Sequence, residues 1–291
     1  MVLESILDPF KAEEKPGKLV LLGFVYSSIA TFLSLWIFRD YSSLIMIFLT
    51  VMAAIPLLYN IIKMEEEKDL QDLGEKWLLK EHSKALSAFM FLFLGITLAC
   101  VLWYVALPSD TVNVLFETQT TTIQSINTHV TGEVSAQVTG QAFRGFGDFA
   151  RIFLNNVKVL VFCILFSFLY GSGAIFILAW NATVIGTATG NFIRSNLAYY
   201  SSLVGFEKTA QYLNIISIGL LKYVIHGVPE ILAYFVAGLA GGIISVAVIK
   251  HDFGTRKFEH ILLDSADLLL LSILLLFIAA ILEVWVTPAI F

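Results

Sequence analysis

The stretch KYVIHGVPEILAYFVAGLAGG, residues 222–242, places three ionisable side chains at four-residue spacing inside a long apolar run. Steps of four residues advance about 400° around a helix, so Lys222, His226 and Glu230 form one stripe. An unpaired ionisable group at the middle of a bilayer costs on the order of 3 kcal/mol. We therefore expect these three side chains to pair with one another or to line a polar cavity.

A proline and a glycine lie within the same stripe. Pro229 lacks an amide hydrogen and clashes with the turn before it, while Gly227 permits backbone conformations that other residues resist. The pattern predicts a broken or re-entrant helix at residues 222–230. Transporters build binding sites on such breaks. Alternatively, His226 and Glu230 satisfy the exposed backbone groups and fix one packing arrangement.

Composition sets the class of protein. Hydrophobic residues make up 58% of the chain and charged residues only 14%, which is typical of an integral membrane protein embedded in a lipid bilayer. No basic stripe is interleaved with aromatic residues, so we do not expect nucleic-acid binding. Cys100 and Cys163 lie in apolar runs and indicate neither a disulfide framework nor a metal site. No small-residue cleavage site follows the first apolar run, so we expect no removable signal peptide.

The apolar segments predict an all-α, polytopic transmembrane helical bundle. A crossing needs about 20 apolar residues. About seven segments are long enough, and the sixth contains the opening stretch. They cover residues 19–38, 42–62, 85–107, 154–170, 174–193, 213–249 and 266–286. Glycine pairs at four-residue spacing, Gly186 with Gly190 and Gly238 with Gly242, predict faces where helices approach closely.

We expect two parts in the chain. Residues 1–84 form an N-terminal two-helix hairpin and an amphipathic connector on the membrane surface. Residues 85–291 form the main membrane domain, which includes the polar segment 108–150. Within that segment, the spacing of apolar residues predicts a helix over 123–134.

Lysine and arginine residues suggest the orientation. They gather near residues 11–18, 63–84 and 250–257, which fall on one side if there are seven crossings. The positive-inside rule makes that side the cytoplasm, so the N-terminus is cytoplasmic and the segment 108–150 is outside the cell membrane.

The motifs assemble no catalytic set. HGVPE offers one His and one Glu without a second His, and His251, Asp252 and His260 lie in a loop at another depth. We therefore predict no metal, no cofactor and no catalytic residues. Asn181 lies in apolar surroundings, where we expect it to form a hydrogen bond between helices.

Three segments together resemble the stage II sporulation protein M (SpoIIM) family, in a longer form seen in archaea. They are NNVKVLVFCILFSFLYGSG (155–173), LAWNATVIG (178–186) and HGVPEILAYFVAGLAGG (226–242), and the resemblance covers about residues 85–291. One departure is Ile225, where many members have proline. The matched positions are Asn155, Asn156, Asn181, Gly186, His226, Gly227 and Glu230. Because the namesake scaffolds cell-wall hydrolases during engulfment, the resemblance implies a membrane scaffold.

Three functions remain open from the sequence. The first is a membrane scaffold or assembly factor with protein partners or a homo-oligomer. The second is a transporter or channel with a site at the His-Gly-x-x-Glu helix, where Lys222 is a possible charge partner. The third is an intramembrane hydrolase built around His226 and Glu230.

Overall fold

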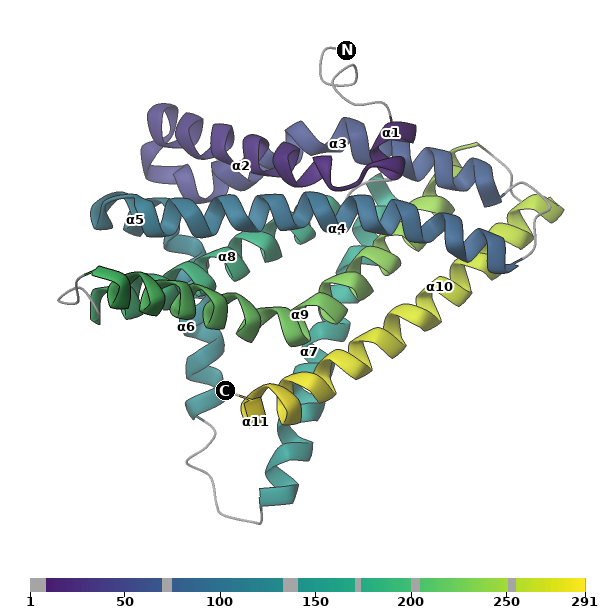
Figure 1. Ribbon diagram of the computed structural model, residues 1–291. Helices are drawn as coiled ribbons and strands as arrows, with labels where there is room; N and C mark the ends of the chain where they lie inside the picture. Colours follow the sequence, from purple (N-terminus) through teal and green to yellow (C-terminus); the bar gives the residue numbers. More distant parts are fainter. Residues whose placement is uncertain are drawn as a thin grey trace.

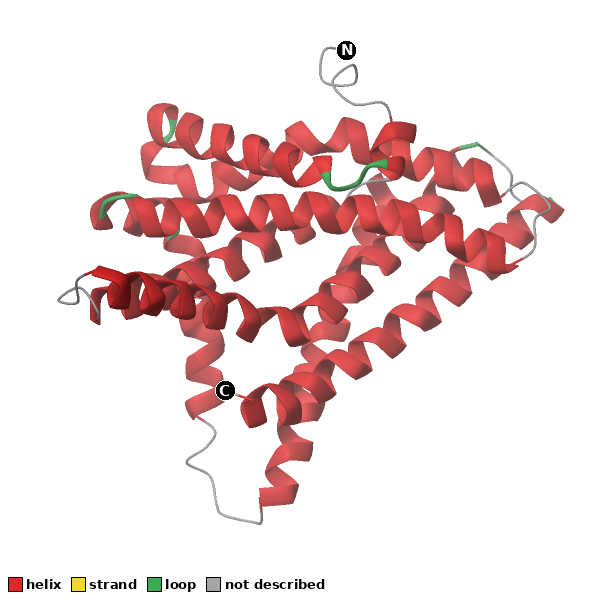
Figure 2. Cartoon of the chain, in the orientation of Figure 1, coloured by secondary structure: helices red, strands yellow, loops and turns green. Residues whose placement is uncertain are grey.

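A computed structural model describes residues 9–69, 75–132, 141–170, 174–199, 205–250 and 255–290. Within these ranges the chain is helical apart from short connections, and no residue is in a strand (Figure 2). The elements are α1 Pro9–Glu14, α2 Lys18–Ile37, a 3-10 turn at Arg39–Tyr41, α3 Ser42–Asp69, α4 Glu75–Ala106, α5 Ser109–Leu115, α6 Glu117–Gly132, α7 Gln141–Tyr170, α8 Ala174–Tyr199, α9 Gly205–Ile249, α10 Arg256–Ile281, a π-helical turn at Leu282–Val286, and α11 Thr287–Ile290.

Seven helices in the described part of the chain are long and apolar enough to cross a membrane. This confirms the prediction of an all-α polytopic bundle with about seven spans. In Figure 1, α2, α3 and α4 run alongside one another, and α8 passes behind them. The second half of α9 runs beside α10, and α7 crosses behind both.

Two glycines allow α2 and α4 to pack backbone against backbone. A Cβ atom on Gly23 would overlap the Leu92 carbonyl oxygen, and one on Gly95 would overlap the Val20 carbonyl oxygen. The two glycines therefore face the opposite helix at one crossing. Gly23 and Gly95 lie in different segments of the sequence, so no spacing pattern indicated this contact.

The predicted glycine face of α8 is confirmed. A Cβ atom on Gly186 would collide with the Cys100 side chain, and one on Gly190 would collide with Tyr104, so α8 packs closely on α4. On α9, Gly238 faces the Ala174 side chain, and Gly241 approaches the Ile164 carbonyl oxygen of α7. Close contacts on α9 are thus seen at Gly238 and Gly241, and the contact expected at Gly242 stays a prediction.

The longest helix, α9, is continuous through residues 222–230, with Pro229 inside it. Figure 1 shows that α9 changes direction along its length instead of folding back on itself. The prediction of a broken or re-entrant helix is therefore corrected to a bent helix. Proline removes only one helical hydrogen bond and clashes with one turn, and neighbouring helices stabilise the bend.

The predicted surface connector is made of the ends of two spanning helices. Residues 63–69 continue α3 and residues 75–84 begin α4, while residues 70–74 lie outside the described residues. The polar segment 108–150 contains α5, α6 and the start of α7. Residues 123–132 of the predicted helix belong to α6, and Figure 1 shows α6 and the start of α7 projecting beyond the other helices.

Candidate functional site

The bend of α9 brings its polar stripe to the π-helical turn at the end of α10. His226 Nδ1 lies 3.3 Å from Thr287 Oγ1, so the hydroxyl and the ring nitrogen form a hydrogen bond whose donor depends on the His tautomer. Thr287 follows the π-helical turn Leu282–Val286 directly. Because a π-helical turn shifts the register of the residues that follow, it decides which side chains of this helix face α9.

Glu230 is bound by a neighbour on its own helix. The Tyr234 hydroxyl donates a hydrogen bond to Glu230 Oε1 over 2.9 Å, and Tyr234 is fully buried. The Glu283 carboxyl, on the π-helical turn, is an electrostatic neighbour of Glu230. His226 thus contacts Thr287, and Glu230 accepts a hydrogen bond from Tyr234. The side chain of Lys222 lies outside the described residues.

Aromatic rings hold the same turn against α7. The Trp285 ring lies 5.6 Å from Phe149 and 6.1 Å from Phe146, measured between ring centroids. Phe277 of α10 contacts Phe149 and Phe153 edge to face. Phe146, Phe149 and Phe153 therefore pack α7 against α10 and the turn that follows it.

The hollows near this region are apolar. A cavity of about 200 Å³ lies between α4, α8 and α9, where Gly227, Val224, Val228 and Ile231 form the α9 wall. A Cβ atom on Gly227 would meet nothing within 4 Å, so this glycine borders open space rather than a close helix contact. Neither His226 nor Glu230 lines this cavity.

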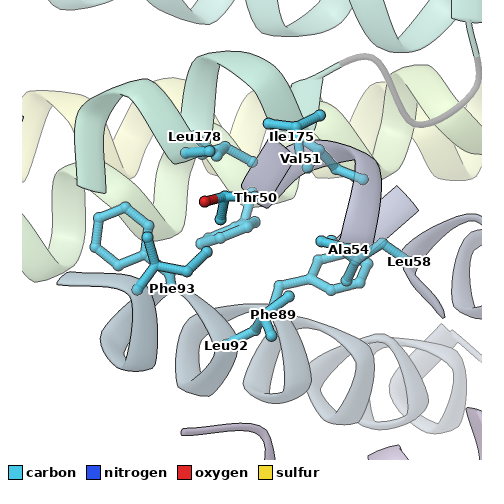
Figure 3. A pocket seen from close by; sticks show the side chains of 12 residues that line it. Thr50, Val51, Ala54, Leu58, Phe89, Leu92, Phe93, Ile175 and Leu178 are labelled. Carbon is cyan, nitrogen blue, oxygen red and sulfur yellow. The ribbon is translucent and has the colours of Figure 1, made fainter. Parts of the chain in front are cut away.

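A second hollow, between α3, α4, α8 and α9, lies in the core (Figure 3). Its volume is about 20 Å³, and Thr50 is surrounded there by Phe89, Phe93 and Leu178 among other apolar side chains. Because the Thr50 hydroxyl donates to the Met46 carbonyl of its own helix, the lining offers a water little to bind. This hollow is a packing defect of a membrane core rather than a polar site.

The other matched positions lie on α7 and α8. Asn155 is exposed and Asn156 is buried on α7. Asn181 Nδ2 donates to the Ile177 carbonyl of its own helix over 2.8 Å. The prediction of a hydrogen bond between helices is wrong for Asn181, because its short side chain reaches the carbonyl one turn back. Asn156 and Gly186 thus occupy buried packing positions on α7 and α8, whereas Asn155 is exposed.

A second polar cluster lies at the other end of the bundle, between α1, α3 and α4. Lys68 Nζ lies 2.8 Å from Glu13 Oε2, 2.5 Å from Glu65 Oε1 and 3.5 Å from Glu81 Oε2. His82 Nδ1 lies 2.6 Å from Glu65 Oε2. We call these five residues the Lys68 cluster. Beside it, Lys250 at the end of α9 forms an ion pair with the buried Glu66 over 2.5 Å.

Burial changes the acidity of one member of the Lys68 cluster. Desolvation raises the pKa of Glu13 to about 7, and the nearby Glu65 carboxyl adds to the rise, while the ammonium of Lys68 opposes it. Glu13 therefore titrates near neutral pH in the folded protein.

The Lys68 cluster was not predicted from the sequence. The run MEEEK at residues 64–68 reads as a solvated, charged face. Only the tertiary structure shows that Glu65 and Glu66 are fully buried. The contact of Tyr234 with Glu230 could have been predicted from the sequence, since Tyr234 follows Glu230 by one helical turn. Among the described residues, no group of three or more His, Cys, Asp or Glu side chains is arranged as a metal site.

A model of a known protein family matches most of the chain. The model is described as Stage II sporulation protein M, and it matches residues 47–288. The chain belongs to the SpoIIM family. The match begins within α3. It therefore includes most of the second span and the members of the Lys68 cluster that lie on α3 and α4. Comparison with curated proteins and with solved structures finds no match.

Proposed function

We propose that this SpoIIM family protein is a membrane scaffold, an assembly factor that holds partner proteins at the bilayer. The proposal rests on the hydrogen bonds that His226 and Glu230 form. The hydrogen bond between His226 and Thr287 joins α9 to the turn after α10, and the hydrogen bond from Tyr234 to Glu230 lies within α9. Groups engaged in this way stabilise one arrangement of helices, which is what a scaffold requires.

The projecting arm supports the same proposal. The arm consists of α6 and the first turns of α7, and it extends beyond the other helices (Figure 1). It is tied to the bundle at its base, where Gln119 Nε2 donates to Thr183 Oγ1 of α8 over 3.3 Å. A polar arm anchored to a packed membrane domain offers a surface for partners. By the lysine distribution, we place this arm outside the cell and the N-terminus in the cytoplasm.

A reconstitution experiment separates the scaffold from a transporter. Purified wild-type protein and the Glu230→Gln variant are placed in liposomes, and the flux of a broad set of ions is measured beside thermal stability. For a scaffold we expect no flux above empty liposomes and a lower unfolding temperature for Glu230→Gln. Flux by the wild type that Glu230→Gln abolishes, with the fold intact, contradicts the scaffold and supports a transporter.

Site-specific photo-crosslinking in native membranes tests the scaffold directly. A photoreactive amino acid replaces Glu117 or Thr121 on the arm, with the buried position Leu239 as control. We expect a defined crosslinked product of larger mass from the arm positions and none from Leu239. If only the isolated chain is recovered from the arm positions, the scaffold proposal fails.

A further inference from the structure

The cavity of about 200 Å³ between α4, α8 and α9 lies near the middle of two membrane spans. On α4 it is lined by Leu94, which lies 14 residues after the start and 12 before the end of the span Lys80–Ala106. On α8 it is lined by Ile185, which lies 11 residues after the start and 13 before the end of the span Ala174–Ala198. At this depth, hydrocarbon chains rather than headgroups surround a membrane protein.

The cavity opens on the side of the bundle, between α4 and α9. Its back wall is buried, with Thr189 of α8 at 1% and Ile231 of α9 at 2% exposure. The exposed lining residues belong to α4 and α9, and their exposures range from 38% to 46%: Phe91, Leu94, Val224 and Val228. Because these side chains lie within the spans, the mouth of the cavity faces lipid.

The lining of the cavity does not suit water. Among the described lining residues, no side chain is charged, and only Thr97 and Thr189 carry a hydroxyl. The Thr97 hydroxyl donates to the Phe93 carbonyl of its own helix over 3.0 Å. A buried water needs two to four polar partners, so an apolar occupant fits this cavity better.

Gly227 makes room in the cavity. It is buried on the α9 wall, and yet a Cβ atom on it would meet nothing within 4 Å. Its backbone is helical, so no unusual backbone conformation requires a glycine. At Gly186 and Gly190, in contrast, a Cβ atom would collide with α4. Glycine also lets a ligand approach the backbone closely, and this use remains for Gly227.

We propose that the cavity binds one hydrocarbon chain of a membrane lipid, which enters from the bilayer between α4 and α9. Its volume exceeds about 150 Å³, the size of an engineered apolar cavity that stays dry and holds benzene. An empty cavity would leave its walls without contacts, and lipid chains are the molecules that surround it. The site does not depend on the scaffold role, so either proposal can fail without the other.

The bound chain lies against the bend of α9. The α9 wall runs from Leu220 to Ile231, so it includes residues on both sides of Pro229. Proline removes one helical hydrogen bond and clashes with the turn before it. A chain that contacts α9 before and after this turn supports the helix where it is weakest. Lipid binding should therefore raise the stability of the protein.

Photolabelling in lipid tests the occupant. The full chain is placed in phosphatidylcholine liposomes in which a small fraction of the lipid carries a diazirine near the methyl end of one acyl chain. After irradiation, mass spectrometry locates the labelled residues. We expect about tenfold more label on Leu94 and Val228 than on Ile29, an equally exposed residue near the middle of α2, because a bound chain stays beside its wall.

Filling the cavity should remove this difference. Gly227→Leu places a side chain in the space of the lipid chain, and it should fold because a Cβ atom there meets nothing. We expect the label on Leu94 to fall about tenfold, to the level of Ile29. Gly147→Leu on α7 is the matched control. A Cβ atom on Gly147 also meets nothing, and this residue does not line the cavity, so the label should stay.

A second variant narrows the mouth of the cavity. Val228→Phe enlarges an exposed side chain at the rim and should also lower the label on Leu94, whereas Val161→Phe on α7, at a valine of similar exposure, should not. Low reactivity of the buried Cys100 and Cys163 verifies that each variant is folded. Phosphatidylcholine added in detergent should raise the unfolding temperature of the wild type and not that of Gly227→Leu.

Three results would overturn the proposal. Equal label on Leu94, Val228 and Ile29 in the wild type would show ordinary bilayer lipid only. Undiminished label in folded Gly227→Leu and Val228→Phe would show that the chain lies outside the cavity. A photoreactive amino acid at Val228 in native membranes should give an adduct with the mass of a lipid, and an adduct with a protein would show that a partner chain occupies the cavity instead.

Discussion

Two polar clusters stabilise ionisable side chains inside the bundle, and they do so with different partners. The Lys68 cluster surrounds one lysine with three carboxylates and adds His82 on Glu65. The cluster at the α9 bend gives Glu230 and His226 the neutral hydroxyls of Tyr234 and Thr287. At the edge of the bundle, a full countercharge stabilises buried carboxylates. Within the spans, hydroxyls form hydrogen bonds with the two ionisable groups, and the nearby Glu283 is a second acidic group rather than a countercharge.

This difference predicts that the Lys68 cluster is the more fragile of the two. Replacing Lys68 by methionine leaves Glu13 and Glu65 buried without their cation, so we expect a loss of about 3–5 kcal/mol of stability. Thermal unfolding in detergent can be followed with a thiol-reactive dye, since Cys100 and Cys163 become accessible only on unfolding. Lys84→Met, at a residue with an exposed ion pair to Glu81, is the control and should change stability by less than about 1 kcal/mol. Equal effects of the two substitutions would contradict the importance of Lys68.

At the α9 bend, the largest effect should come from Tyr234→Phe. This substitution keeps the ring but removes the donor to Glu230, which we expect to cost about 1.5–3 kcal/mol. The same dye assay measures the shift in unfolding temperature. Tyr41→Phe, at a tyrosine that is 72% exposed, provides the control and should leave the temperature unchanged. An unchanged temperature for Tyr234→Phe would show that this hydrogen bond does not stabilise the bend.

The Lys68 cluster should also respond to pH through Glu13. Its folded pKa of about 7 lies above the ordinary glutamate value of 4.5, so the folded state holds the proton more tightly. The contribution of Glu13 is therefore fully present below pH 4.5 and is lost as pH rises to about 7, with a slope of at most about 1.4 kcal/mol per pH unit. The stability difference between wild type and Glu13→Gln, measured by unfolding between pH 4.5 and 8, should decrease over this window. A difference that stays constant would contradict the raised pKa.

The smallest effect is expected for Thr287→Val. This change removes the hydroxyl beside His226 and keeps the shape, so we expect a loss of about 1 kcal/mol. Thr121→Val on the exposed face of α6 is the control, because its hydroxyl bonds only its own helix. If Thr287→Val destabilised the protein as strongly as Lys68→Met, neutral partners would stabilise the fold as much as a countercharge does. That result would contradict the difference between the two polar clusters.

Much of the fold could be predicted from the sequence, but the partners of the candidate site residues could not. Apolar runs of sufficient length predicted the seven spans, and Gly186 with Gly190 predicted a close helix contact. Of the candidate site, His226 and Glu230 stood out because charge in an apolar run is rare. Their partners did not, since Thr287 is 61 residues from His226 and its position depends on a π-helical turn.

The sequence alone determined the class of this protein, an all-helical SpoIIM family membrane protein, because the length and apolarity of each span are local properties. The tertiary structure decided which polar groups are buried and what they contact. It replaced an expected break at Pro229 with a bent but continuous helix, and it buried Glu65 and Glu66 of the charged run at residues 64–68. The physical reason is that burial and pairing depend on neighbours from distant parts of the chain, which no local pattern specifies.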